Sequence, residues 1–128
     1  MVIDKKISLT ALIKAKNQLA YAIKNAKSEL EITGAIKCFE YCYELSWKTM
    51  KKILESMGLV DINSPRTVFI EAFKNQLIDN LSVWNSFITQ RNLTFHTYDE
   101  EIALEVFDSL PQFLDHLVKF IEHIQNKQ

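Results

Sequence analysis

The sequence predicts an all-α protein, built as an up-and-down four-helix bundle with one additional short helix. Two observations support this fold class. The 128 residues include only two glycines and two prolines, so few positions interrupt regular structure. Apolar residues also recur at spacings of three and four over long stretches, which is the period of amphipathic helices. The length fits one domain over residues 1–128, large enough to bury a core without disulfide bonds.

The N-terminal half predicts two long helices. The first is expected at roughly residues 7–30, with an apolar side made of Leu9, Leu12, Ile13, Leu19, Ile23, Ala26 and Leu30. Residues 31–34 then break the pattern, and Thr33 is expected to cap the second helix. That helix should cover about residues 34–57, with an apolar face of Ile36, Phe39, Tyr43, Trp47, Met50, Leu54 and Met57. Gly58 is expected to end it.

Three further helices are predicted in the C-terminal half. Ser64 and Pro65 should begin the short helix as N-cap and first helical residue, with Val68, Phe69, Ala72 and Phe73 on its apolar face. Asp79 or Asn80 is expected to cap the next helix. The last helix begins near Tyr98, and its apolar stripe contains Ile102, Val106, Leu110, Phe113, Leu117, Ile121 and Ile124. Pro111 lies inside it and should kink the helix rather than end it.

The second helix has an additional apolar stripe, formed by Cys38, Tyr41, Cys42 and Leu45. A helix with two apolar sides either lies between neighbouring helices or contributes one side to another subunit. Because the chain has few helices to surround it, we expect this stripe to form a homodimer interface. No histidine or further cysteine lies near Cys38 and Cys42 in the sequence, so we expect core or interface thiols rather than a zinc site or a disulfide.

Charge and hydropathy exclude several classes of protein. The net charge is −1, so no overall field attracts nucleic acid or anionic membranes. Residues 1–66 have 11 basic and 7 acidic side chains, whereas residues 67–128 have 4 and 9. This asymmetry is typical of mixed solvated faces, or else of a complementary partner or self-assembly. The N-terminus lacks the apolar region of a signal peptide, and no apolar run is long enough to span a bilayer, so a cytoplasmic protein is expected.

One short stretch, residues 91–100, contains the strongest chemical constellation of the chain. Arg91 is a residue type that binds phosphate bidentately, His96 is one that transfers protons near neutral pH, and Tyr98 follows two positions later. Leu81, Trp84, Ile88 and Phe95 form a helical stripe that includes Arg91. Thr97 and Glu100 match a capping box, which predicts that a new helix begins there.

The spacing of Arg91 and His96 limits how they cooperate. On an unbroken helix, residues five apart differ by about 140° of rotation and point apart. The two side chains share a ligand only if the helix ends near Thr94, or if a second subunit completes the site. A structural alternative is that Arg91 forms ion pairs with Glu40 or Glu44, and that His96 is an ordinary surface residue.

The chain resembles proteins of the HEPN superfamily, and more closely their nucleotidyltransferase substrate-binding branch. The resemblance rests on Arg91, His96 and Tyr98 at the spacing of the superfamily signature. It also rests on segments in the expected order between residues 39 and 101: Phe39-Glu40, Glu44, Trp47-Lys48, Ser64-Pro65-Arg66, Glu71-Ala72-Phe73, Leu77-Ile78, Trp84, Arg91-Asn92-Leu93-Thr94 and His96-Thr97-Tyr98-Asp99-Glu100. The first and last helices match only as generic amphipathic helices.

The resemblance implies a homodimeric bundle encoded beside a minimal nucleotidyltransferase. In HEPN ribonucleases of toxin–antitoxin pairs, the arginine and histidine act without a metal in a cleft between the two subunits. Carried over to this chain, His96 is the general acid/base, Arg91 stabilises the phosphate, and Glu44 orients one of them. Tyr98 corresponds to the tyrosine to which the partner transfers AMP, and no cofactor is implied.

Two positions depart from the family pattern. Phe95 stands where a small polar residue usually precedes the histidine, and its bulk narrows the expected cleft. Gln76 replaces a glycine that commonly precedes Leu-Ile. Three functions remain open at this point: a ribonuclease toxin, a non-catalytic subunit that binds a substrate or nucleotide for the nucleotidyltransferase, and a plain helical interaction module. The cluster Lys48, Lys51 and Lys52 is a candidate guide for an RNA strand, such as a tRNA end.

Overall fold

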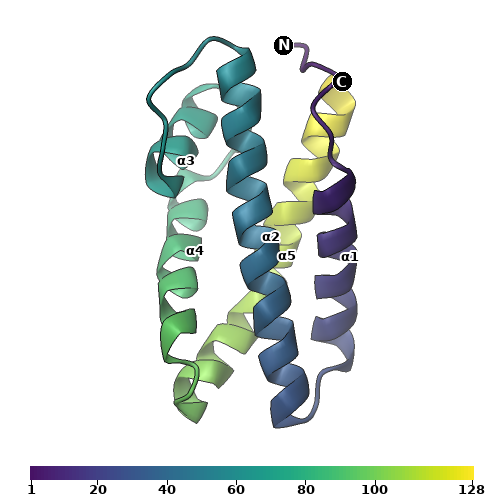
Figure 1. Cartoon of the computed structure of the whole chain (residues 1–128), viewed down its shortest axis with the longest axis vertical. Coiled ribbons are helices and arrows are strands. Elements are labelled where there is room, and N and C mark those ends of the chain that lie inside the picture. Colours follow the sequence, from purple (N-terminus) through teal and green to yellow (C-terminus); the bar gives the residue numbers. More distant parts are fainter.

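The computed structural model describes residues 1–128 and contains helices only. In chain order they are α1 (Thr10–Asn25), α2 (Glu29–Ser56), α3 (Pro65–Lys74), α4 (Leu81–Leu93), a 3-10 turn η1 (Thr94–His96) and α5 (Glu100–Lys127). Figure 1 shows α1 and α4 running in one direction and α2 and α5 in the other, with the short α3 beside one end of α2. The predicted four-helix bundle with one short helix is therefore confirmed.

The core contains an aromatic cluster that joins α2, α3, α4 and α5. The Phe39 ring meets Phe113 edge-on with centroids 4.9 Å apart, and Phe87 meets Phe113 at 5.0 Å. Trp84 lies between Phe87, at 5.2 Å, and Phe69, at 5.4 Å. Each such pair adds about 0.5–1.5 kcal/mol to the stabilisation from burial, so these rings set how α4 lies against α5.

The start of α2 differs from the prediction. Ser28, not Thr33, is the N-cap: its hydroxyl accepts from the Glu31 backbone N–H at 3.1 Å, and the Glu31 carboxylate accepts from the Ser28 N–H at 2.9 Å. This reciprocal capping box satisfies two N–H groups that the helix itself leaves unpaired. Thr33 consequently lies inside α2, and Leu30 falls in its first turn, 81% exposed, rather than on the apolar side of α1.

The start of α5 also differs from the prediction. Asp99 is the N-cap, with its carboxylate accepting from the backbone N–H of Glu101 at 2.9 Å. The hydroxyl of Thr97 instead donates to the Thr94 carbonyl at 3.1 Å, so the expected capping box of Thr97 and Glu100 does not form. A carboxylate is the stronger acceptor for helix N–H groups because it also interacts favourably with the helix dipole.

The other helix ends agree with the sequence. Ser64 and Pro65 begin α3 and Asn80 caps α4, as predicted. Gly58 follows α2 at φ +97°, a left-handed conformation that favours glycine. Pro111 lies within α5, which continues through it to Lys127, as expected.

The second apolar stripe of α2 is partly covered within the chain, with Leu45 half-buried, and its role as a homodimer interface stays a prediction. Cys42 is fully buried and Cys38 is half-buried beside Tyr21 and Ala22 of α1. Only Tyr41 remains exposed, at 54%. Burial, with a smaller contribution from Cys38, raises the pKa of the Cys42 thiol to about 12. A thiol that stays protonated is a poor nucleophile and metal ligand, so Cys42 serves packing.

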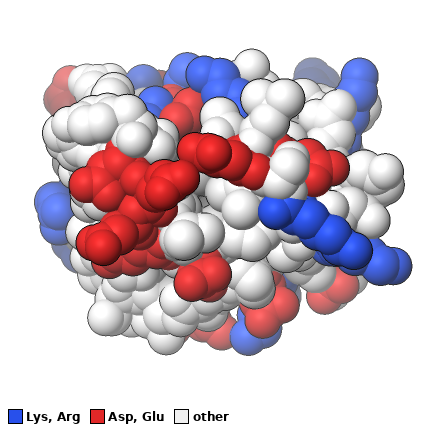
Figure 2. Space-filling view, turned by 90° about the horizontal axis from the view of Figure 1, so that it is seen from below, with Lys and Arg blue, Asp and Glu red and all other residues white.

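One end of the bundle is acidic. The first turns of α2 and α5 lie at this end and contain Glu29, Glu31, Glu100 and Glu101. Figure 2 shows the acidic side chains gathered on this face, with basic side chains to one side of them. None of the helices combines the length and the hydrophobicity that spanning a bilayer requires.

Candidate functional site

The stretch from Arg91 to Tyr98 forms the chain reversal between α4 and α5. Helix α4 ends at Leu93 and η1 follows immediately, so the regular rotation from Arg91 to His96 is interrupted. This is the first of the two conditions under which the pair was expected to cooperate. The buried hydroxyl of Thr94 stabilises the turn by donating to the Arg91 carbonyl at 2.7 Å.

Arg91 lies between two carboxylates of α2. Its Nη1 is 3.9 Å from Glu40 Oε1 and its Nε is 3.8 Å from Glu44 Oε1, while Nη1 also donates to Thr94 Oγ1 at 2.7 Å. The Arg91 side chain is 22% exposed. The Arg91 Nε is buried and has no hydrogen-bond partner. The predicted proximity of Arg91 to Glu44 and Glu40 is therefore present, and it joins α4 to α2.

The two carboxylates are themselves held by neighbours on α2. Glu44 accepts from the Trp47 indole N–H at 3.1 Å and lies 3.9 Å from the Lys48 ammonium. Glu40 pairs with Lys37 at 3.2 Å. The network contains three cations and two anions, so the carboxylates do not fully neutralise it. At 3.8–3.9 Å the arginine contacts are longer than the 2.7–2.9 Å of close charge-assisted hydrogen bonds, so the two ion pairs leave the Arg91 Nε without a close partner.

Phe95 covers the guanidinium from the solvent side. The Arg91 Cζ lies 5.0 Å from the centre of the Phe95 ring, within the range of a cation–π contact. Phe95 is 68% exposed and lies beyond the end of α4, so its predicted place on the helical stripe with Trp84 was wrong. The reason is that α4 ends at Leu93, after which the helical period no longer applies. Sequence reasoning missed the stacked Arg91–Phe95 pair, although an aromatic residue four positions after an arginine is a weak signal of it.

His96 and Tyr98 form a second, exposed pair. The Tyr98 hydroxyl is 3.5 Å from His96 Nδ1, and the two ring centroids are 6.0 Å apart at 74°. Tyr98 is 85% exposed. No hydrogen bond connects His96 with Arg91 within the chain. One chain therefore presents two half-sites, the anchored Arg91 and the exposed His96–Tyr98 pair.

The lysines of α2 differ in their availability. Lys48 interacts with Glu44, and Lys51 donates to the Asn63 side chain at 3.2 Å. Lys52 is exposed and has neither an ion pair nor a hydrogen bond. The predicted cluster therefore reduces to one fully available cation near this side of α2. No group of three or more His, Cys, Asp or Glu side chains is arranged to hold a metal ion.

Comparison with known proteins identifies the family. Residues 7–126 match the family described as nucleotidyltransferase substrate binding protein like. This chain belongs to that family. The predicted resemblance is thereby confirmed over nearly the whole chain, including the first and last helices. Among curated relatives, the Haemophilus influenzae protein named "Probable ribonuclease HepT" is 35% identical over 100 residues, which cover 75% of this chain and 68% of that protein.

Two solved structures share the fold of this chain. HI0074 from Haemophilus influenzae, described as having the fold of a substrate binding domain of a nucleotidyltransferase, superposes with a TM-score of 0.82. The match has 28% identity and covers 92% of this chain and 99% of HI0074. A protein of Thermus thermophilus also gives a TM-score of 0.82, at 26% identity, covering 88% of this chain and 98% of its own. The helical bundle is therefore the common framework on which Arg91, His96 and Tyr98 are placed.

Proposed function

We propose that this protein is a metal-independent endoribonuclease toxin that works with a minimal nucleotidyltransferase encoded beside it. The observation that carries the proposal is the turn at the end of α4. There a half-buried arginine whose Nε has no hydrogen-bond partner is followed by an exposed histidine in hydrogen-bond range of an exposed tyrosine. The 35% identical relative named as a HepT ribonuclease supports the same activity.

In the proposed reaction, His96 removes the proton of a ribose 2′-hydroxyl, whose oxygen attacks the adjacent phosphorus. The bond to the 5′-oxygen breaks, that oxygen takes up a proton, and a 2′,3′-cyclic phosphate remains. Arg91 stabilises the negative charge that develops on the phosphate oxygens. Its position is maintained by Glu44, Glu40 and Thr94, so little reorganisation is needed during the reaction.

A homodimer completes this proposal. Phe95 and Tyr98, on either side of His96, are 68% and 85% exposed, and Tyr41 beside Glu40 is 54% exposed. A second copy over this surface would cover apolar area and set the Arg91 of one subunit opposite the His96 of the other. We expect Tyr41→Glu to produce monomers in light scattering. Tyr21→Glu, at a 72% exposed tyrosine of α1, should leave the dimer intact, and a dimeric Tyr41→Glu protein contradicts this interface.

Cleavage is tested with a tRNA in chelator, comparing the wild type with Arg91→Ala and His96→Ala. We expect product ends with a cyclic phosphate from the wild type and a loss of at least about a hundredfold in either variant. An RNA with a 2′-deoxyribose at the cleaved position should be resistant. Cleavage that persists in both variants, or that requires added metal, would falsify the mechanism.

We also propose that AMP transfer to Tyr98 silences the protein, and the contact between Tyr98 and His96 supports this. The Tyr98 oxygen attacks the α-phosphate of ATP, pyrophosphate leaves, and the phenolic proton is lost. The attached phosphodiester removes the hydroxyl that faces His96 and places bulk and negative charge where the RNA phosphate must bind. With the nucleotidyltransferase and ATP, the intact mass should rise by one adenylate group, also in Tyr21→Phe but not in Tyr98→Phe. A mass shift in Tyr98→Phe rules out this acceptor.

The second candidate is a non-catalytic subunit that binds a substrate or nucleotide for the nucleotidyltransferase. The acidic end of the bundle beside Asp99 and Glu100 favours it, because acidic side chains weaken the approach of an RNA backbone. The cleavage assay separates the two candidates, since the binding subunit leaves RNA intact in every variant.

A further inference from the structure

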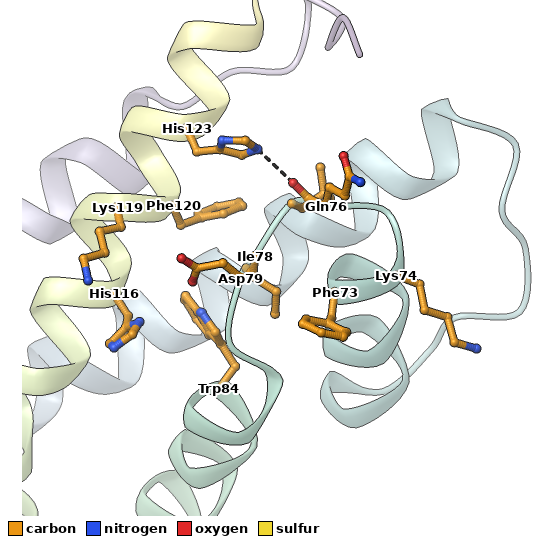
Figure 3. A pocket seen from close by; sticks show the side chains of 11 residues that line it. Phe73, Lys74, Gln76, Ile78, Asp79, Trp84, His116, Lys119, Phe120 and His123 are labelled. Carbon is orange, nitrogen blue, oxygen red and sulfur yellow. Dashed lines mark hydrogen bonds between the residues drawn. The ribbon is translucent and has the colours of Figure 1, made fainter.

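A cavity of about 710 Å³ lies between the α3–α4 connection and the C-terminal half of α5. It is distinct from the site at Arg91, because it adjoins the beginning of α4 rather than its end (Figure 3). Its volume falls in the range of small-molecule sites, about 300–1,000 Å³. Buried apolar side chains form its floor and the half-exposed Phe73 stands at its rim; the floor consists of Leu77, Ile78, Trp84 and Phe120.

One face of α5 supplies basic groups to this cavity. His116, Lys119 and His123 follow at spacings of three and four, so they lie on one side of the helix. None of the three has an acidic partner within ion-pair distance. Asp79, across the cavity on the α3–α4 connection, is equally unpaired. The cavity therefore combines an apolar floor with two histidines, one lysine and one carboxylate, none of which forms an ion pair within the chain.

The rim residue Gln76 has an unusual backbone conformation. Its φ is +62°, a left-handed value that a residue other than glycine adopts only at a cost. The Gln76 carbonyl accepts a hydrogen bond from His123 Nε2 at 2.8 Å, drawn in Figure 3, which ties the connection to α5. Glycine would give the same backbone without strain, and it is the backbone carbonyl of Gln76 that contacts His123 across the cavity. Strained residues of this kind concentrate at binding sites.

We propose that this cavity binds a small aromatic compound with a phosphate group, of the size of a nucleoside monophosphate. The ring packs on Phe73 and the apolar floor, because a flat aromatic surface is best buried against other rings. The phosphate binds the Lys119 ammonium and a ring N–H of His116, neither of which forms an ion pair within the chain. Asp79 accepts a hydrogen bond from an amino group on the ring. The site goes beyond the ribonuclease proposal and uses neither Arg91 nor His96.

Titration calorimetry on the full chain tests this site, with AMP, UMP, adenosine and inorganic phosphate as probes. AMP should bind saturably and at least about tenfold more tightly than adenosine or phosphate, because neither fragment fills both parts of the cavity. Lys119→Gln should weaken AMP binding by about tenfold or more. The control Lys127→Gln changes a lysine of the same helix that does not line the cavity, and should bind AMP as the wild type does.

Two further variants distinguish binding in this cavity from a general loss of fold and from binding at Arg91. Phe73→Ala should weaken AMP binding several-fold with an unchanged circular dichroism spectrum, because Phe73 is 43% exposed at the rim of the cavity; a loss of binding is then not a loss of fold. Asp79→Asn should reduce the preference for AMP over UMP. The proposal is overturned if no probe binds, if adenosine matches AMP, or if Lys119→Gln binds normally. It is equally overturned if Arg91→Ala abolishes AMP binding, since the ligand then occupies the other site.

Discussion

The replacement Arg91→Lys separates the catalytic role of Arg91 from its structural one. Lysine keeps the positive charge between Glu40 and Glu44, but it lacks the planar fork of a guanidinium. The substitution removes the hydrogen bond to Thr94, a loss of about 1 kcal/mol, and weakens the stacking with Phe95 by up to about 1 kcal/mol. We therefore expect the free energy of unfolding to fall by about 1–2 kcal/mol, which leaves the protein folded.

The effect on cleavage should be much larger. Removal of one fixed donor to a developing charge typically lowers kcat by about 10²–10³-fold, and we expect a loss in that range for Arg91→Lys. Initial rates on RNA in chelator and urea unfolding of the same preparations give the two quantities. Arg66→Lys is the matched control, because Arg66 is the chain's other arginine, is exposed and forms no ion pair; it should change neither quantity. If Arg91→Lys cleaves RNA at the wild-type rate, a point charge is sufficient and the argument from the guanidinium fork fails.

Three further predictions concern stability. Gln76→Gly should raise the free energy of unfolding by about 1 kcal/mol in urea titrations, because glycine adopts φ +62° without strain; a decrease contradicts this. Ser28→Ala should lower the free energy of unfolding by about 1 kcal/mol, because the capping box of α2 is lost. The effect should be confined to α2, and a loss of helix in α5 would contradict this local role of Ser28. Burial raises the pKa of Tyr43 to about 12, with a smaller contribution from Glu44. The neutral Tyr43 side chain therefore contributes its full stabilisation of the fold below about pH 10, the ordinary pKa of tyrosine, and loses it as the pH rises toward 12. Tyr43→Phe should therefore unfold at higher pH in circular dichroism than the wild type; identical alkaline transitions would disprove the assignment.

The candidate site was only partly predictable from the sequence. Arg91, His96 and Tyr98 lie within eight residues, so their occurrence together is visible in the sequence itself. The stacking of Phe95 on Arg91 was not, because it depends on where α4 stops and how the chain then turns. The ion pairs of Arg91 with α2 were expected as an alternative, and they are present.

The sequence by itself determined the helices, their apolar faces and several of their ends, such as Ser64 before α3 and Gly58 after α2. These features depend on residues within one or two turns of each other, and periodicity reports such local preferences. Only the tertiary structure decided that Ser28 rather than Thr33 caps α2, and that α1 packs against that helix. It also brought Gln76 against His123, 47 residues away, to form the cavity beside α5. Such contacts depend on how whole helices pack, and the spacing of residues along one helix does not contain that information.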